Sequence, residues 1–400
     1  MRAICSRSVR KIAVTLAAAA LVVLGAYVIH QFAVSVDVDT DPGAGGAPLR
    51  TELERTLEVI RAKHRVPALA AAVVRGDTVG EIAAVGVRHA GQPERVTVDD
   101  RFHLGSDTKA MTATLVALFI KEGRLRWDTP LTELLPELAS EMDPAYRAVT
   151  VEMLMHHEAG LPDDRQDVAY ARRMASLRGS PAEQRFEAAR ISLASPPAYP
   201  PGTRNVYANM SFNILGAGLE RLTGESWEAQ LTRRLFEPLG MTKAGFGSPS
   251  APGEVDQPWG HAVRGIWPQR LFWIERTPLP PAGAPAGNAC MSLGDWARFV
   301  SLHLEAARGP CRFLSCASFE RLHRENPKGS GFAAGWGVSQ EATGSVLQHA
   351  GSDGWWYALA VLDPARGEAY LAVSNAGGER GAGACQEAVA VLRSKPGSGP

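Results

Sequence analysis

The chain has 400 residues, and its 42 Lys and Arg are balanced by 42 Asp and Glu, so its formal net charge is zero. A nucleic-acid binder needs a basic face, and this balance argues against that class of protein. Hydrophobic residues make up 45% and charged residues 21%, which is typical of a globular protein and excludes a disordered, collagen-like or multi-span membrane chain. The length predicts two lobes or one composite fold.

Residues 1–36 have the features of an export segment. Four cations among residues 1–11 precede an uncharged apolar run at 12–29. As a helix with a rise of about 1.5 Å per residue, that run would span roughly 27 Å and could cross a membrane. Because the positive flank stays in the cytoplasm, we expect the rest of the chain on the periplasmic side. It would be anchored in the inner membrane by residues 12–29, or secreted if the segment is cleaved.

The remainder of the chain predicts a linker and one folded part. Residues 37–50 are rich in Gly and Pro and predict a flexible linker, and residues 51–395 form the expected domain. Apolar spacing predicts a helix at 51–64, and 68–87 reads as two strands around a Gly-Asp turn. Further strands are predicted at 345–349, 355–362 and 369–374. Helices are predicted at 106–122, 151–157, 182–193, 210–222, 226–236, 292–306 and 385–393, with 246–288 as loop. A sheet would therefore form from both ends of the chain, with helices of about 103–245 inserted.

The segment LGSDTKAMTA carries a serine, Ser106, three residues before a lysine, Lys109. Residues three apart share a helix face, so the amine can reach the hydroxyl. A serine alcohol is a poor nucleophile until a base takes its proton, and a desolvated lysine can be that base. The alternative interpretation of Ser106 is a plain helix N-cap. The motif also recurs by chance, since Ser8 and Lys11 have the same spacing.

Two further triplets carry chemistry. Tyr207-Ala208-Asn209 offers a tyrosine that can exchange a proton in a cationic site and an amide that can donate and accept. His349-Ala350-Gly351 offers a donor on a strand, followed by a glycine that lets a substrate backbone approach. Either triplet alone is weak, because the first also fits a surface turn and the pattern of the second recurs at His89 and His103.

Four cysteines follow the apolar run. Cys311 and Cys316 are close enough in sequence to pair across a loop in an oxidising compartment, and buried free thiols are the alternative for them and for Cys290 and Cys385. None has the spacing of a metal ligand, so we expect no metal and no cofactor.

Taken together, the order Ser-x-x-Lys, Tyr-x-Asn, His-x-Gly resembles the serine β-lactamase and penicillin-binding-protein superfamily. The chain is similar to its class C β-lactamase branch, which includes D-alanyl-D-alanine carboxypeptidases, D-aminopeptidases and carboxylesterases. The resemblance extends over about residues 50–393 and includes VTVEMLMHHEAGLP, YPPGTRNVYANMSFNILG, LFEPLGMTKAGFG and AGNACMSLGDWARFVSLHL. It implies an α+β, β-lactamase/transpeptidase-like fold, with an antiparallel sheet flanked by terminal helices beside an all-helical region.

The resemblance also implies roles for individual residues. Ser106 would be the acyl-accepting nucleophile, and Lys109 and Tyr207 would share proton transfer, with the acylation base left open. Asn209 would hold the substrate amide. His349 would stand where relatives carry lysine, which weakens the anchoring of a carboxylate. The oxyanion hole would use the backbone N–H groups of Ser106 and of Ser352, the residue after Gly351.

Some neighbouring residues are not assigned to the site. Asp107 is expected to face away from it as a first-turn anion. His156 and His157 are expected to pack at a helix end or in a loop. Trp355, Trp356 and Tyr357 would form an apolar substrate wall or pack in the core.

The sequence thus predicts a serine hydrolase that works through an acyl-enzyme on an amide, ester or lactam bond of a small or peptidoglycan-like acyl substrate. The rival hypothesis is a membrane-tethered protein that binds peptidoglycan or a partner without turnover. The sequence leaves the choice of substrate and the oligomeric state open.

Overall fold

The computed structural model describes residues 35–37, 49–164, 168–264, 270–275, 279–306, 311–326, 329–342 and 344–394. The predicted membrane segment at 12–29 and most of the linker predicted at 37–50 lie outside these residues. Within the described ranges, no helix has both the length and the apolar character needed to span a bilayer.

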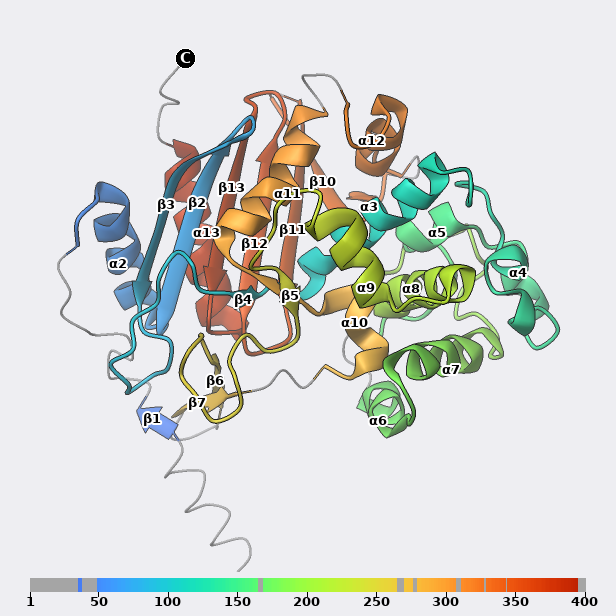
Figure 1. The fold of residues 1–400 in the computed structure, drawn as a ribbon, viewed down its shortest axis with the longest axis horizontal. Coiled ribbons are helices and arrows are strands. Elements are labelled where there is room, and N and C mark those ends of the chain that lie inside the picture. Colours follow the sequence, from blue (N-terminus) through green and yellow to red (C-terminus); the bar gives the residue numbers. More distant parts are fainter. Residues whose placement is uncertain are drawn as a thin grey trace, which may run out of the picture.

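The centre of the molecule is a seven-stranded sheet in which every neighbouring pair is antiparallel (Figure 1). Its order is β3-β2-β13-β12-β11-β10-β9. The strands are β2 (Ala68–Arg75), β3 (Thr78–Gly86), β9 (Phe332–Ala333), β10 (Trp336–Glu341), β11 (Gly344–Ser352), β12 (Tyr357–Asp363) and β13 (Glu368–Ser374). The expectation of a sheet built from both ends of the chain is confirmed, because β2 pairs directly with β13.

Strand β2 shows why this sheet is covered on both faces. Its residues alternate between two buried clusters: Ala68, Ala70 and Ala72 belong to one, and Leu69 and Ala71 belong to the other. Successive side chains of a strand point to opposite faces, so an unbroken apolar run needs a layer on each side.

The terminal helices α2 (Glu52–His64) and α13 (Gly378–Ser394) form the layer on one face (Figure 1). Helix α2 starts where predicted because Thr51 and Glu54 form a capping box. Helix α13 begins seven residues earlier than predicted, since the glycine-rich start GERGAGAC has no apolar period. Its glycines allow close packing instead: a β-carbon on Gly383 would lie 2.8 Å from the ring of His64 in α2.

The other face packs against α11 (Leu293–Glu305) and the helical region. This region contains α3 (Thr108–Lys121), α4 (Leu131–Leu134), α5 (Val151–Met155), α6 (Val168–Ser176), α7 (Pro181–Leu193), α8 (Asn209–Thr223) and α9 (Trp227–Leu231), and α9 continues as a π-helical turn at Thr232–Phe236. The helices predicted in this region and at 292–306 are confirmed to within a few residues. Helices α4, α6 and α12 (Cys316–His323) and strand β10 were not predicted.

The stretch 246–288, predicted as loop, contains regular structure. Strands β6 (Gly260–Arg264) and β7 (Arg270–Ile274) form a hairpin that also pairs with β1 (Ser35–Asp37). Helix α10 (Ala284–Gly287) and strand β8 (Ala289–Met291) follow, and β8 lies between β4 (Phe102–His103) and β5 (Gly245–Phe246). The sequence did not indicate these short elements, because Pro and Gly are frequent there and occur both in loops and at the ends of helices and strands.

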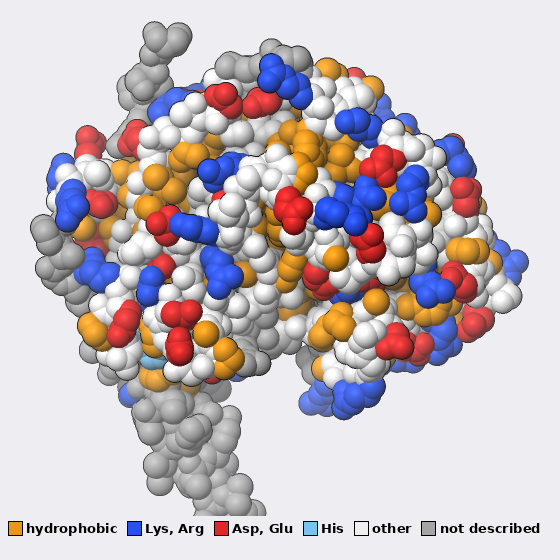
Figure 2. All heavy atoms as spheres, viewed as in Figure 1, with side chains coloured by type: hydrophobic (Ala, Val, Ile, Leu, Met, Phe, Trp, Pro, Cys, Tyr) orange, Lys and Arg blue, Asp and Glu red, His pale blue; other side chains and the backbone are white. Residues whose placement is uncertain are grey.

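The charges of both signs are interspersed over the face of the molecule shown in Figure 2, without a large patch of one sign. This distribution agrees with the balanced composition.

Candidate active site

Ser106 lies in a tight turn where the sheet meets the helical region. The chain leaves β4, makes a 3-10 turn at Gly105–Asp107 (η1), and enters α3 at Thr108. Strand β11 passes directly against this turn: a β-carbon on Gly105 would lie 2.4 Å from the backbone nitrogen of Ser352. A β-carbon on Gly351 would in turn lie 2.8 Å from the backbone nitrogen of Ser106. Two glycines thus bring the backbone N–H groups of Ser106 and Ser352 close together.

Gly351 serves this contact rather than the one expected from the sequence. We expected its missing side chain to admit a substrate backbone. In the structure the space belongs to the protein's own turn, because a β-carbon there would lie 1.9 Å from the carbonyl oxygen of Leu104. The glycine is therefore needed for the turn and the strand to touch at all.

The hydroxyl of Ser106 contacts both predicted proton-transfer groups. The Nζ of Lys109 lies 3.0 Å from Ser106 Oγ, and Tyr207 Oη lies 2.8 Å from the same oxygen. The Tyr207 ring centroid is 4.8 Å from the Lys109 nitrogen, which places a cation beside the phenol. The structure therefore brings the three residues together from η1, from α3 and from the segment before α8.

Lys109 is fully buried and its ammonium is oriented by two carbonyl oxygens. Its Nζ donates to Asn209 Oδ1 at 2.8 Å and to the backbone oxygen of Ala286 at 2.7 Å. A lysine nitrogen has three donor positions, and these two acceptors occupy two of them. The third direction is the one that faces Ser106 Oγ at 3.0 Å.

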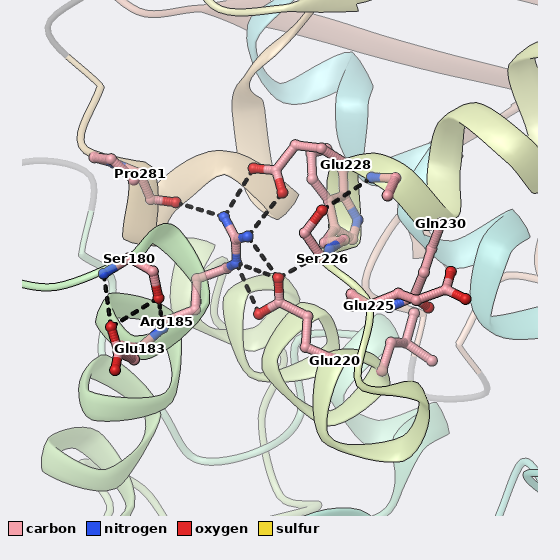
Figure 3. Close-up of polar contacts among 12 residues, drawn as sticks. Ser180, Glu183, Arg185, Glu220, Glu225, Ser226, Glu228, Gln230 and Pro281 are labelled. Atoms are coloured by element: carbon pink, nitrogen blue, oxygen red, sulfur yellow. Dashed lines mark hydrogen bonds and ion pairs between the residues drawn. The ribbon is translucent and has the colours of Figure 1, made fainter.

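The backbone of Ala286 was not predicted as part of the site, and a buried ion network holds the segment that contains it. Arg185, from α7, donates to Glu220 of α8, to Glu228 of α9 and, at 2.9 Å, to the oxygen of Pro281 (Figure 3). Pro281 begins the turn Pro281–Gly283 (η5) that leads into α10. The sequence does not indicate this network, because its members come from four separate elements.

His349 sits in the sheet at the edge of the site as a neutral side chain. Burial and the charge of Lys109 lower its pKa to about 3. Its Nδ1 lies 3.0 Å from the carbonyl oxygen of Ala350, and because a carbonyl only accepts, Nδ1 carries the proton. The lowered pKa and this contact favour the uncharged imidazole at His349.

Asp107 does not match the prediction that it faces away from the site as a first-turn anion. The side chain is buried, and neither carboxyl oxygen has a hydrogen-bond partner among the described residues. Burial raises its pKa well above the usual range. Its Oδ2 faces Gly351, where a β-carbon would lie 2.7 Å away, so the carboxyl group packs against β11.

His157 packs in a loop as expected, but what it packs against is the tyrosine of the site. Its ring stacks on Tyr207 with centroids 4.5 Å apart, and its Nδ1 accepts from the backbone N–H of Ala208 at 3.1 Å. Burial lowers its pKa well below the usual value, so it is neutral. Its φ of 56° is in the left-handed region, which is uncommon for a residue other than glycine.

Among the aromatic residues after β11, Trp356 is buried in the core and so follows the core-packing alternative, not the substrate-wall alternative. Trp355 is half-buried and stacks with Arg264, whose guanidinium carbon is 4.4 Å from the ring centroid. Of the cysteines, Cys311 and Cys316 form a disulfide, while Cys290 and Cys385 are buried free thiols.

Sequence comparisons relate the chain to known proteins. A family model described as Beta-lactamase matches residues 53–393. The chain is 29% identical over 337 residues to "Penicillin-binding protein 4" of Amycolatopsis lactamdurans, covering 81% of this chain and 84% of that protein. It is 28% identical over 378 residues to "Esterase EstB" of Burkholderia gladioli, covering 82% and 91%.

Solved structures show the same fold. The octameric penicillin-binding protein homologue from Pyrococcus abyssi superposes with a TM-score of 0.71 at 22% identity, covering 86% of this chain and 77% of that one. The architecture is therefore the β-lactamase/transpeptidase-like α+β fold. The chain belongs to the beta-lactamase family, because the family model covers most of its length.

Proposed function

We propose that the protein is a serine hydrolase that works through an acyl-enzyme on Ser106. The observation that supports it most directly is the placement of Ser106 Oγ within hydrogen-bond distance of both Lys109 Nζ and Tyr207 Oη. In the first step Oγ attacks the carbonyl carbon of the substrate, and its proton passes to the unprotonated member of the Lys109–Tyr207 pair, either a neutral Lys109 amine or a Tyr207 phenolate. The same pair then returns a proton to the leaving amine or alcohol as its bond to carbon breaks.

The remaining predicted residues serve this reaction. The backbone N–H groups of Ser106 and Ser352 would stabilise the oxyanion, and preorganised donors of this kind contribute about 3–4 kcal/mol each. Asn209 would orient both Lys109 and a substrate amide. Water then attacks the acyl-enzyme, releases the acid and restores Ser106.

The substrate is an amide, ester or lactam of a small or peptide-like acyl group. The neutral His349 favours substrates that need no ammonium group at that position, such as neutral esters and amides, over those that present a carboxylate there. The named relatives include a penicillin-binding protein and an esterase, which keeps both lactams and esters as candidates.

We further propose an extracytoplasmic location, with residues 12–29 as an inner-membrane anchor or a cleaved signal. The Cys311–Cys316 disulfide supports an oxidising compartment, because such bonds are rare in the cytosol.

The test is a time course of intact mass for the full chain mixed with benzylpenicillin or with p-nitrophenyl butyrate. We expect an adduct that is absent in Ser106→Ala and retained in Ser8→Ala, the serine of the chance copy of the motif. A persistent penicillin adduct indicates a penicillin-binding peptidase. A transient adduct with consumption of the drug indicates a β-lactamase, and turnover of the ester alone indicates an esterase. Labelling that survives in Ser106→Ala refutes the proposal. No adduct and no turnover with either compound favours the non-catalytic binding protein.

A further inference from the structure

Asn209 is held by a carboxylate that belongs to none of the three motifs. Asp164 lies in the loop after α5, 45 residues before Asn209, and is 7% exposed. Its Oδ1 accepts from the backbone N–H of Asn209 at 2.9 Å and from Asn209 Nδ2 at 3.0 Å, and its Oδ2 accepts from the N–H of Met210 at 2.8 Å. All three donors are N–H groups, and these contacts oppose the burial that raises the pKa of this carboxyl group.

This carboxylate takes the place of a missing helix cap. Helix α8 begins at Asn209, and the residue at its N-cap position, Ala208, has no side chain that can accept a hydrogen bond. The first N–H groups of a helix lack partners within it, and the helix dipole favours a negative charge there. Asp164 supplies both acceptor and charge from a distant part of the chain.

The same contact decides which end of the Asn209 amide faces Lys109. A carboxylate only accepts, so the amide must turn its NH2 toward Asp164. Its oxygen then points the other way, where it accepts from Lys109 Nζ at 2.8 Å. If the amide were reversed, its NH2 would face the amine of Lys109, donor against donor.

We propose that Asp164 is a positioning residue for acylation, which it assists by orienting the Asn209 amide so that this amide fixes the Lys109 amine toward Ser106. The inference rests on the proposed acyl-enzyme function. A residue outside the three motifs would thus help to keep one N–H direction of Lys109 pointing at the nucleophile, Ser106.

Asp164→Ala tests this idea because it removes both acceptor oxygens, including the Oδ1 that receives both N–H groups of Asn209. In single-turnover acylation of the full chain by p-nitrophenyl butyrate, we expect the rate constant to fall on the order of 100-fold, as for a displacement of a catalytic group by about 1 Å. The matched control is Asp163→Ala, an exposed neighbour with the same change of charge and size, which should stay within about twofold of wild type. An unchanged rate in Asp164→Ala overturns the proposal.

A double-mutant cycle separates positioning from a general effect on folding. If Asp164 acts through the amide of Asn209, then Asp164→Ala should change the rate of Asn209→Ala by less than about twofold. If the two losses multiply, Asp164 acts through the stability of α8 and not through the amide, and the proposal is wrong.

A third measurement does not depend on activity. The side-chain NH2 signal of Asn209, assigned by its loss in Asn209→Ala, should exchange slowly with solvent in wild type and quickly in Asp164→Ala. Fast exchange in the wild type overturns the positioning role. Failure of the proposed function is seen separately, as the absence of any acyl-enzyme on Ser106 in the wild type.

Discussion

Gly351→Ala is a sharp test of how the site is assembled. The added methyl group would lie 1.9 Å from the carbonyl oxygen of Leu104 and 2.8 Å from the backbone nitrogen of Ser106. Both neighbours are backbone atoms, so no side chain can rotate to make room. Carbon and oxygen atoms that are not bonded need more than about 3 Å, so β11 must move from the turn by roughly 1 Å.

The displacement separates the two N–H groups that would stabilise the oxyanion. A misplacement of about 1 Å reduces a catalytic rate by on the order of 100-fold, and the overpacking should lower the free energy of unfolding by about 1–3 kcal/mol. The assay is the acylation rate with p-nitrophenyl butyrate beside a urea unfolding curve. The control is Gly294→Ala in α11, where the nearest atoms would be 3.9 and 4.0 Å from the new methyl group. A Gly351→Ala variant with wild-type acylation and stability would show that the reasoning about this contact is wrong.

Two further predictions concern stability. Arg185→Met should lower the free energy of unfolding by about 3–5 kcal/mol, because it leaves two buried or half-buried glutamates without their cation, whereas Arg233→Met at an exposed pair should cost less than about 1 kcal/mol. Urea curves would decide, and equal losses would contradict the claim. The pKa values of His261 and His349 are lowered to about 3, and that of His323 is lowered to about 4. Each of these side chains therefore binds a proton more readily in the unfolded than in the folded protein. Their contribution to stability is present above pH 6.5 and is lost as the pH falls toward these values. In His323→Asn the slope of stability against pH between pH 6 and 4.5 should be smaller by about 1 kcal/mol per unit, and an unchanged slope would refute this.

Local signals in the sequence were sufficient where one element determines its own structure. The apolar spacing within 51–64 predicted α2, and the Gly-Asp turn within 68–87 predicted the pair of strands β2 and β3. The spacing of Ser106 and Lys109 on one turn likewise follows from helix geometry alone. These features involve neighbours in the chain and can be derived without the fold.

The parts that escaped prediction depend on contacts between distant segments. Nothing near Asp164 indicates that it caps a helix 45 residues away. The environment of Asp107 is set by β11, which arrives more than 200 residues later, so its burial could not be read from its own helix. The early start of α13 depends on the closeness of α2, because glycines such as Gly383 carry no apolar period and become useful only where another helix touches them.

The second acceptor for Lys109 is the main-chain oxygen of Ala286, and this has a consequence for how the protein can vary. Every amino acid carries that oxygen, so no ordinary substitution at position 286 deletes it. The contact is instead sensitive to length: a residue inserted or removed between Pro281 and Ala286 would present a different oxygen to the amine. We expect this short segment to tolerate exchange of its side chains within the space available and to tolerate no change in its number of residues.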